Sequence, residues 1–533
     1  MASKRHSLFL ASLVILSCSL AGGIYGQRVQ ASASSPKDDD VKASLQTFAK
    51  AYNLVENTFA DPVTPDRAIY DGAIPGMLRT LDPHSSFQDP KAFARLREEQ
   101  RGNYYGVGMR VVMRGSAGSI VYEPFKGSPA WKAGLRPGDL IVMVNQTNAR
   151  GMNTEQVAAL LKGPRGTEVT IEVEREGSTE PLSFRVVRDS INVTSVPEAV
   201  SLNGGVYYIR IEQFMETTSR DLQDDLNKIG EANIKGLILD LRENPGGLVN
   251  EGVAVADKFL NKGDVIVSHH GRAPDAGKNT VYTAQTGNHG RLYPIVVLVN
   301  RSSASAAEIV TGALQDHDRA WVFGDNTFGK GLVQSVYPLV ENTGLLLVTA
   351  KYYTPSGRQI QRDYSHSSFY DYYLKQNTEA RNLQDVKMTD SGRTVYGGGG
   401  ISPDEKYVYP KHDQFEVELA RNNAYFNFTT HYLGAHNVKV TPDWRPDTTV
   451  MNGFHDFLLK KEIPFTEAEF TQDSDWLKRQ ITMAVLWTGL SDQDSHAYEE
   501  MTDPEVLKAV ESLPKAQALL NSANKLVVQR RVK

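Results

Sequence analysis

The chain is almost free of cysteine, and this absence excludes several kinds of chemistry. Its 533 residues include one cysteine, Cys18, which lies inside an apolar N-terminal run. The residues after it therefore provide no disulfide, no thiolate zinc site and no cysteine nucleophile. The H-E-x-x-H pattern of zinc peptidases is also missing, and we expect no metal site.

The chain also lacks an excess of charge of either sign. It has 58 Lys and Arg residues against 63 Asp and Glu residues, which gives a formal net charge of −5, and 40% of its residues are hydrophobic. This composition excludes a disordered protein, a polytopic membrane protein and a broadly basic nucleic-acid binder. At roughly 100 to 200 residues per domain, the length predicts about three to four domains.

The first residues have the pattern of an export signal. Lys4 and Arg5 precede the apolar run 8–16, so we expect residues 1–33 to be a signal peptide or a membrane anchor. Ala31-Ser32-Ala33 is a candidate cleavage site. Because the run is about as long as a short membrane span, removal and anchoring both stay open. Either outcome places the rest of the protein in the periplasm or on the outer face of the cytoplasmic membrane.

Changes in composition and periodicity divide the rest of the chain. We expect a linker and helical region at 34–100, a β-rich domain at 101–190, an α/β domain at 191–406 and a mostly helical extension at 407–533. The α/β prediction depends on apolar strands at 206–211, 235–241 and 293–299, which alternate with helical segments. The extension carries no chemical motif, so its role stays open.

A glycine-rich loop opens the β-rich domain. Tyr105-Gly106-Val107-Gly108 is followed by Ser128-Pro129-Ala130 and Pro137-Gly138-Asp139, and the region resembles the PDZ domains of bacterial proteases. The resemblance implies that backbone N–H groups around Tyr105, Gly106, Val107 and Gly108 bind the terminal carboxylate of a peptide. The alternative is that these glycines only form turns.

Ser305 stands where a predicted strand gives way to a predicted helix. The strand is 293–299, and Ala306, Ile309 and Val310 begin the apolar face of the helix. Such a turn offers free backbone N–H groups and the positive end of the helix dipole, which suits a group that supports a developing oxyanion. The alternative is an ordinary helix N-cap, the commonest role of serine at this position.

Lys330 lies between two glycines, immediately before the predicted strand 332–337. If the strand begins at the lysine, Lys330 and Gln334 project from the same face. A lysine can act as a base toward serine only if its surroundings lower its pKa, because the ammonium form has no lone pair. The uncharged amide of Gln334 can orient the amine without restoring its charge. A solvated turn is the alternative.

Three separated signatures resemble those of the carboxyl-terminal processing peptidases, which are tail-specific serine proteases with a Ser/Lys dyad. They are Asp240–Gly247, Ser303–Glu308 and Thr327–Gly331, and the resemblance extends from about Leu54 to Asp404. It implies that Ser305 is the nucleophile, that Lys330 is the general base and that Gln334 orients this base. It also implies that the oxyanion hole consists of the N–H group of Ala306 and that of Gly246 or Gly247, between which the sequence does not decide.

The resemblance also implies an architecture and a set of partners. The expected fold is multidomain, with an α/β crotonase/Clp-protease-like catalytic core at 191–406, an inserted-type PDZ domain of α+β class, a helical N-terminal region and a mostly helical C-terminal extension. No metal or organic cofactor is expected. The expected partners are protein or peptide substrates with apolar C-termini, and not nucleic acid. An adaptor protein and the oligomeric state are left open.

We therefore expect an extracytoplasmic serine endopeptidase that cleaves through an acyl-enzyme. The alternative is a non-catalytic PDZ scaffold, which would have lost Ser305 or Lys330, and both are present. A P-loop is excluded, because Gly331 stands where a Ser or Thr must bind magnesium. His84 lies in the turn-rich segment 81–87, where we expect a loop residue without a catalytic role.

Overall fold

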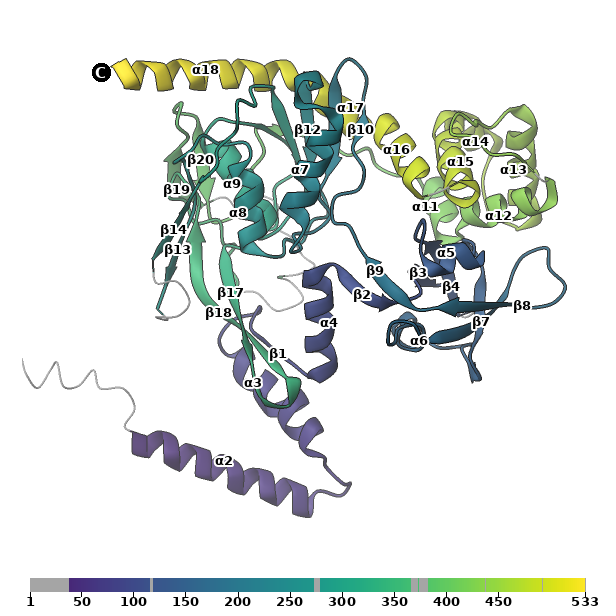
Figure 1. The fold of residues 1–533 in the computed structure, drawn as a ribbon, viewed down its shortest axis with the longest axis horizontal. Helices are drawn as coiled ribbons and strands as arrows, with labels where there is room; N and C mark the ends of the chain where they lie inside the picture. The colour runs from purple at the N-terminus through teal and green to yellow at the C-terminus, as the bar shows by residue number, and fades with distance from the viewer. Residues whose placement is uncertain are drawn as a thin grey trace, which may run out of the picture. The chain divides into compact units, whose positions relative to one another are not determined.

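The computed structural model describes residues 38–115, 118–272, 279–365, 372, 382–436, 438–490 and 492–532. The predicted export segment, residues 1–33, lies outside these residues. The described chain forms two compact units that divide after Leu81 (Figure 1). A search of the described helices finds none with the length and apolar character needed to cross a membrane.

The first unit is helical, as the sequence predicts. It contains α2 (Asp38–Thr58), the π-helix η2 (Asp66–Ala73) and α3 (Ile74–Arg79). Several large apolar side chains of α2 are exposed, among them Leu45, Phe48 and Leu54.

The second unit begins with a short strand and a helix that lead into the β-rich region. These are β1 (Ser86–Gln88) and α4 (Pro90–Arg101). The β-rich sheet consists of β3 (Met109–Met113), β4 (Ser119–Pro124), β5 (Leu140–Val144), β6 (Thr147–Asn148), β7 (Glu168–Glu174) and β8 (Leu182–Val187), all antiparallel. Two helices pack on its core, α5 (Pro129–Ala133) and α6 (Thr154–Leu161). A separate pair, β2 (Asn103–Gly106) and β9 (Asp189–Asn192), connects this region to the rest of the chain.

The predicted α/β core is built on a sheet in the order β10-β11-β12-β15-β16-β21. Its strands are β10 (Val200–Ser201), β11 (Val206–Arg210), β12 (Gly236–Asp240), β15 (Ile295–Val299), β16 (Trp321–Gly324) and β21 (Glu405–Lys406). All pairs are parallel except β10–β11. The central strands β12 and β15 are buried along their whole length, as expected for a parallel sheet covered on both faces.

Alternate residues of these strands face different helical layers. Leu237, Leu239 and Val297 pack in one cluster with α7 (Thr218–Ile229), α8 (Val249–Asp257) and α9 (Ala306–Asp316). Tyr208, Ile238, Val296 and Leu298 pack in another with α17 (Pro504–Glu511) and α18 (Leu513–Val532). The last two helices of the chain therefore complete the core, a long-range contact that the sequence did not predict.

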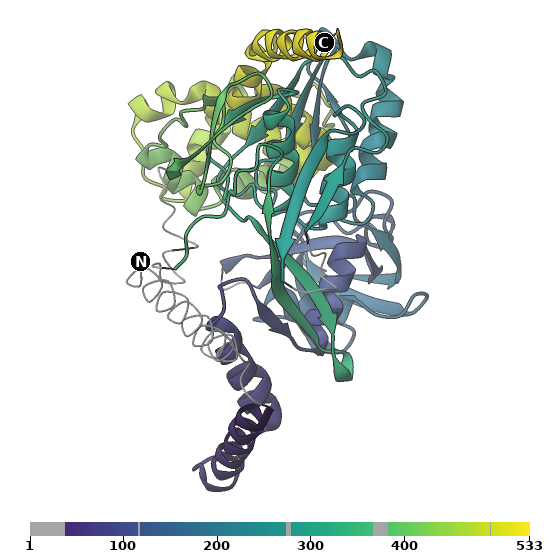
Figure 2. The same ribbon diagram turned by 90° about the vertical axis from the view of Figure 1, so that its left-hand side faces the viewer.

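A second sheet carries the predicted lysine loop. It joins β1, β18 (Gly344–Tyr353), β13 (Val265–Gly271) and β14 (Thr280–Thr283), with β17 (Leu332–Pro338) paired to β18. Figure 2 shows the β17–β18 hairpin as a long ribbon that reaches out from the α/β core. A small pair, β19 (Asn382–Met388) and β20 (Thr394–Gly397), follows in the sequence.

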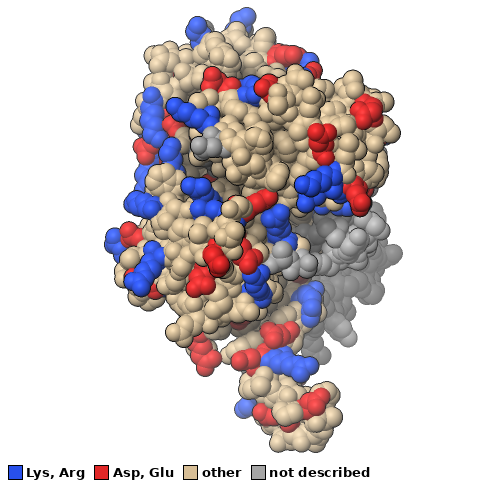
Figure 3. Space-filling view, turned by 90° about the vertical axis from the view of Figure 1, so that its right-hand side faces the viewer, with Lys and Arg blue, Asp and Glu red and all other residues tan. Residues whose placement is uncertain are grey.

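The C-terminal extension is helical, as predicted. Before α17 it consists of α11 (Gln414–Arg421), α12 (Ala424–His436), α13 (Thr448–Lys460), α14 (Glu467–Gln472), α15 (Ser474–Gly489) and α16 (Asp492–Thr502). Phe454, Leu458, Ile481 and Val485 are buried in its core. On the face of the molecule in Figure 3, positive and negative side chains are interspersed, in keeping with the balanced charge of the sequence.

Candidate active site

The turn before α9 holds Ser305 in an uncommon backbone conformation. Its φ of 55° and ψ of −112° differ from the extended backbone of an ordinary N-cap such as Ser128, which has φ −67° and ψ 166°. A positive φ is strained for a residue other than glycine and is often associated with a functional site. Ser305 is the N-cap of α9, as the alternative supposed, but in this uncommon conformation, and it is only 8% exposed.

A buried carboxylate joins the serine turn to the lysine loop. Glu308 accepts hydrogen bonds from the backbone N–H groups of Ser305 (2.8 Å), Gly329 (2.7 Å) and Lys330 (2.9 Å). It also accepts one from the Thr327 hydroxyl at 2.5 Å. Burial raises the pKa of Glu308 above its ordinary value, while these hydrogen bonds favour its charged form. The sequence showed Glu308 only as part of a signature, and the structure gives it the task of fixing the two segments side by side.

The Lys330 amine is held by a neutral partner. Its Nζ donates to Oε1 of Gln334 at 2.5 Å, and Nε2 of Gln334 donates to the carbonyl of His84 at 2.8 Å. Burial lowers the pKa of Lys330 below its ordinary value, although the carboxylates of Glu308 and Asp82 act in the opposite direction. No hydrogen bond joins this amine to the Ser305 hydroxyl in the described part of the chain. Such catalytic contacts often form only when substrate binds.

His84 lies in a loop, as expected, but its carbonyl makes a contact with Gln334 that the sequence did not predict. The Asp82 carboxylate accepts hydrogen bonds from the N–H groups of His84 and Ser85 and shapes the turn, and the carbonyl of His84 then receives Gln334. Burial is the main cause that lowers the pKa of His84 to about 4, so its ring is neutral at neutral pH. The ring bonds Tyr372 at 3.0 Å rather than Lys330. The sequence predicted the turn at 81–87, but it did not predict the contact of the His84 carbonyl with Gln334.

The backbone of the Asn244–Gly247 loop distinguishes its two glycines. The N–H of Gly246 donates to Oδ1 of Asn244 at 2.8 Å. The N–H of Gly247, like that of Ala306 at the start of α9, has no partner among the described residues. Gly247 has φ 138°, and a Cβ there would lie 2.2 Å from the carbonyl oxygen of Phe214, so a side chain is excluded.

The predicted peptide-binding loop lies at the end of β2. Tyr105 is exposed, and the carbonyls of Val107 and Gly108 accept hydrogen bonds from the N–H groups of Ala130 and Phe125. A Cβ at Gly108, where φ is 77°, would lie 2.5 Å from the Cβ of Ser128, so this glycine also permits close packing. Carboxylate binding by Tyr105, Gly106, Val107 and Gly108 stays a prediction.

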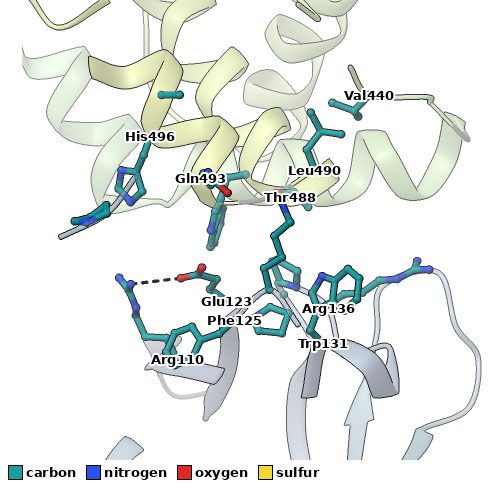
Figure 4. A pocket seen from close by; sticks show the side chains of 18 of the residues that line it. Arg110, Glu123, Phe125, Trp131, Arg136, Val440, Thr488, Leu490, Gln493 and His496 are labelled. Carbon is teal, nitrogen blue, oxygen red and sulfur yellow. Dashed lines mark ion pairs between the residues drawn. The ribbon is translucent and has the colours of Figure 1, made fainter. Parts of the chain in front are cut away.

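A large cavity of the described structure lies away from these residues. It has a volume of about 1140 Å³ and lies between the β-rich region and the C-terminal helices (Figure 4). Its lining includes Phe125, Trp131, Val440 and Leu490, and none of the predicted catalytic or peptide-binding residues. Among the described residues, no group of three or more His, Cys, Asp and Glu side chains is arranged to hold a metal ion.

Three family models match the chain. Residues 205–365 match Peptidase family S41, residues 120–175 match a PDZ domain, and residues 22–92 match the activating protease CtpB N-terminal domain. The first of these matches contains Ser305, Lys330 and the Asn244–Gly247 loop.

Characterised relatives agree with these matches. The carboxy-terminal-processing protease of Bartonella bacilliformis is 37% identical over 361 residues, which cover 67% of this chain and 80% of that protein. The carboxy-terminal processing protease CtpB of Bacillus subtilis is 32% identical over 333 residues, 62% of this chain and 68% of that protein. A solved photosystem II D1 C-terminal processing protease is 28% identical, covers 68% of this chain and 88% of that chain, and has a TM-score of 0.35.

These matches define a serine-type peptidase with a PDZ domain. The chain belongs to Peptidase family S41, among the carboxy-terminal processing proteases. The family resemblance and the multidomain fold class predicted from the sequence are confirmed. The matches therefore favour a serine-type peptidase over the alternative of a peptide-binding scaffold without enzymatic activity.

Proposed function

We propose that the chain is an extracytoplasmic endopeptidase that recognises apolar C-terminal tails of protein substrates and cleaves them through a Ser305/Lys330 dyad. The observation that carries the proposal is the half-buried Lys330 amine, which is bonded to the neutral amide of Gln334. The backbone N–H of the same lysine is joined to the Ser305 turn through Glu308. Burial lowers the pKa of Lys330, and this favours the unprotonated amine that a base requires.

The proposed reaction begins with proton transfer from Ser305 Oγ to the neutral Lys330 amine. Oγ attacks the scissile carbonyl carbon, and the resulting oxyanion accepts hydrogen bonds from two backbone N–H groups. The lysine then gives its proton to the leaving amine, which leaves an acyl-enzyme. Lys330 next takes a proton from water, and the hydroxide so formed attacks the acyl carbon. The bond between this carbon and Ser305 Oγ then breaks, Lys330 returns its proton to Oγ, and the acyl product leaves.

We assign the two oxyanion donors to Gly247 and Ala306. The support is that the N–H of Gly246 is already engaged with Asn244 Oδ1, whereas those of Gly247 and Ala306 lack partners in the described structure. The first turn of α9 adds the positive end of a helix dipole beside Ala306. The proposal therefore selects Gly247 from the two glycines that the sequence left open.

The proposed tail recognition assigns Tyr105, Gly106, Val107 and Gly108 to the terminal carboxylate of the substrate. Its support is the PDZ match, together with a loop in which the carbonyls of Val107 and Gly108 already accept hydrogen bonds from other residues of the domain. The proposed location outside the cytoplasm has its support in the charged and apolar pattern of residues 1–33.

Changing the chemistry of the substrate terminus tests tail recognition. A peptide with a free apolar C-terminus should be cleaved with a kcat/KM roughly tenfold or more above that of the same peptide amidated at its C-terminus. The reason is that a hydrogen bond to a charged group contributes about 1.5 to 3 kcal/mol. Acetylation of the N-terminus of the same peptide is the control. Equal rates for the free and amidated peptides would contradict the assigned role of the loop.

Two variants of Gln334 test how the base is held. Gln334→Ala should lower kcat/KM at neutral pH by roughly tenfold, because the amine loses the partner that orients it. Gln334→Glu should move the rising limb of the pH profile to higher pH, because a carboxylate beside Lys330 stabilises the ammonium form and raises its pKa. The measurement is kcat/KM as a function of pH. An unshifted limb in Gln334→Glu would contradict the assignment of Lys330 as the titrating base.

A further inference from the structure

The C-terminal extension contacts the loop that carries Gly247. The contact is Arg242, whose side chain is 12% exposed. Its Nη1 donates to Asp503 Oδ2 and to Glu505 Oε2, each at 2.8 Å. Its Nε donates to Asp240 Oδ2 at 2.8 Å and its Nη2 to the same oxygen at 2.6 Å. One guanidinium therefore connects the end of β12 with the beginning of α17.

The two acidic partners are themselves fixed in place. Asp503 is the N-cap of α17, where its Oδ1 accepts a hydrogen bond from the N–H of Glu505 at 2.8 Å. Glu505 is buried in the first turn of the helix and accepts a hydrogen bond from the Tyr409 hydroxyl at 3.1 Å. Both carboxylates lie in the N-terminal turn of the helix, where its dipole favours negative charge. Arg242 therefore meets a rigid anionic site rather than two mobile surface side chains.

The loop between Arg242 and Gly247 is tied to the serine segment. The carbonyl of Leu241 accepts a hydrogen bond from the Ser303 hydroxyl at 2.7 Å, and the carbonyl of Asn244 accepts one from the Ala304 N–H at 2.9 Å. Asn244 also bonds the Gly246 N–H. The segment that runs from Arg242 to Gly247 is therefore hydrogen-bonded to the serine segment as well as to the start of α17.

We propose that the extension is a positioning element of the active site: Asp503 and Glu505 hold Arg242, and Arg242 holds the loop that presents the Gly247 N–H to the oxyanion. The inference rests on the proposed function, because it requires the oxyanion role of Gly247. The acidic pair lies outside the Peptidase family S41 match, which ends at residue 365, whereas Arg242 lies inside it. Asp503 and Glu505 are positioning residues and do not touch substrate.

The experiment uses the full-length chain with both carboxylates replaced by isosteric amides, Asp503→Asn together with Glu505→Gln. Asparagine still caps a helix, so α17 keeps its start, while the charge on both α17 partners of Arg242 is removed and the pairing with Asp240 at the end of β12 is left in place. We expect kcat for an apolar-tailed peptide to fall about tenfold with KM unchanged, because transition-state stabilisation is lost without loss of ground-state binding. Active-site titration with a serine-directed phosphonate corrects each rate for the fraction of competent enzyme.

Glu511→Gln is the matched control. It makes the same chemical change on the same helix, at an exposed residue that pairs with Lys508 and not with Arg242. Its kcat should equal that of the wild type. A wild-type kcat in the double variant would overturn the inference, and so would a loss that disappears after correction for active sites, since that would indicate only less folded enzyme.

The outcomes also separate this inference from the proposed function. If Ser305→Ala is inactive and the double variant keeps the wild-type kcat, the positioning role fails while the dyad stands. If Ser305→Ala retains wild-type activity, the proposed function fails, and the positioning role fails with it whatever the double variant shows.

Discussion

Ser305→Ala is expected to abolish cleavage of an unstructured protein with an apolar tail. The variant lacks the oxygen that attacks the scissile carbonyl, so no acyl-enzyme can form, and kcat should fall on the order of 10⁴- to 10⁶-fold. The fold should be retained, because the contacts that join Ser305 to Glu308 and to Tyr352 are made by its backbone. Its N–H donates to Glu308, and its carbonyl accepts from Tyr352 at 3.1 Å. Mass spectrometry of the substrate after incubation provides the measurement.

Ser302→Ala is the control for this prediction. Ser302 lies in the same segment, and its described hydrogen bond is made by its backbone N–H to Asn300 Oδ1 at 3.1 Å. Activity should therefore survive this change. If the Ser305→Ala enzyme formed as much product as the wild type, Ser305 would be excluded as the nucleophile.

Lys330→Ala is expected to lower kcat/KM by about 10² to 10⁴-fold, the usual contribution of a general base. It should also change the pH profile. In the wild type, burial lowers the pKa of Lys330. The neutral amine therefore forms at a pH below the ordinary lysine pKa of about 10.4, and the rise in activity should occur at the same lowered pH. Activity falls as pH decreases through this lowered pKa, because the amine becomes protonated. The variant should lose this limb of the profile.

The measurement for Lys330 is kcat/KM across the neutral and alkaline range. Lys351→Ala is the control, because Lys351 is an exposed lysine on the neighbouring strand β18 and should be dispensable. A Lys330→Ala enzyme with the wild-type rate and an unchanged limb would show that another group accepts the proton.

The parts of this molecule that were predictable from the sequence depend on neighbours along the chain. The strand β15 and the helix α9 follow from a run of buried apolar residues and from an apolar helical face. Lys330 and Gln334 meet as predicted, although β17 begins at Leu332, so the lysine precedes the strand and does not begin it. The signature Ser303–Glu308 then placed Ser305 between β15 and α9.

The contacts that the sequence did not reveal join segments far apart in the chain. The carbonyl of His84 meets Gln334 across a separation of 250 residues, and no pattern near either residue indicates this. Which of Gly246 and Gly247 donates its N–H to the oxyanion depends on the direction in which each N–H points. This direction is fixed only in the folded loop, where the two residues have φ values of 97° and 138°. The pairing of Arg242 with Glu505 likewise depends on how α17 packs on the core sheet.

The two-sided burial of the core sheet has a consequence for how the protein matures. A ribosome makes the chain from its N-terminus, so the sheet face formed by Tyr208, Ile238, Val296 and Leu298 has no cover until α17 and the start of α18 emerge. Ser305 and Lys330 are translated long before that moment. Both faces of the core sheet are therefore covered only after α17 and the start of α18, which lie far beyond Lys330 in the sequence, have been made.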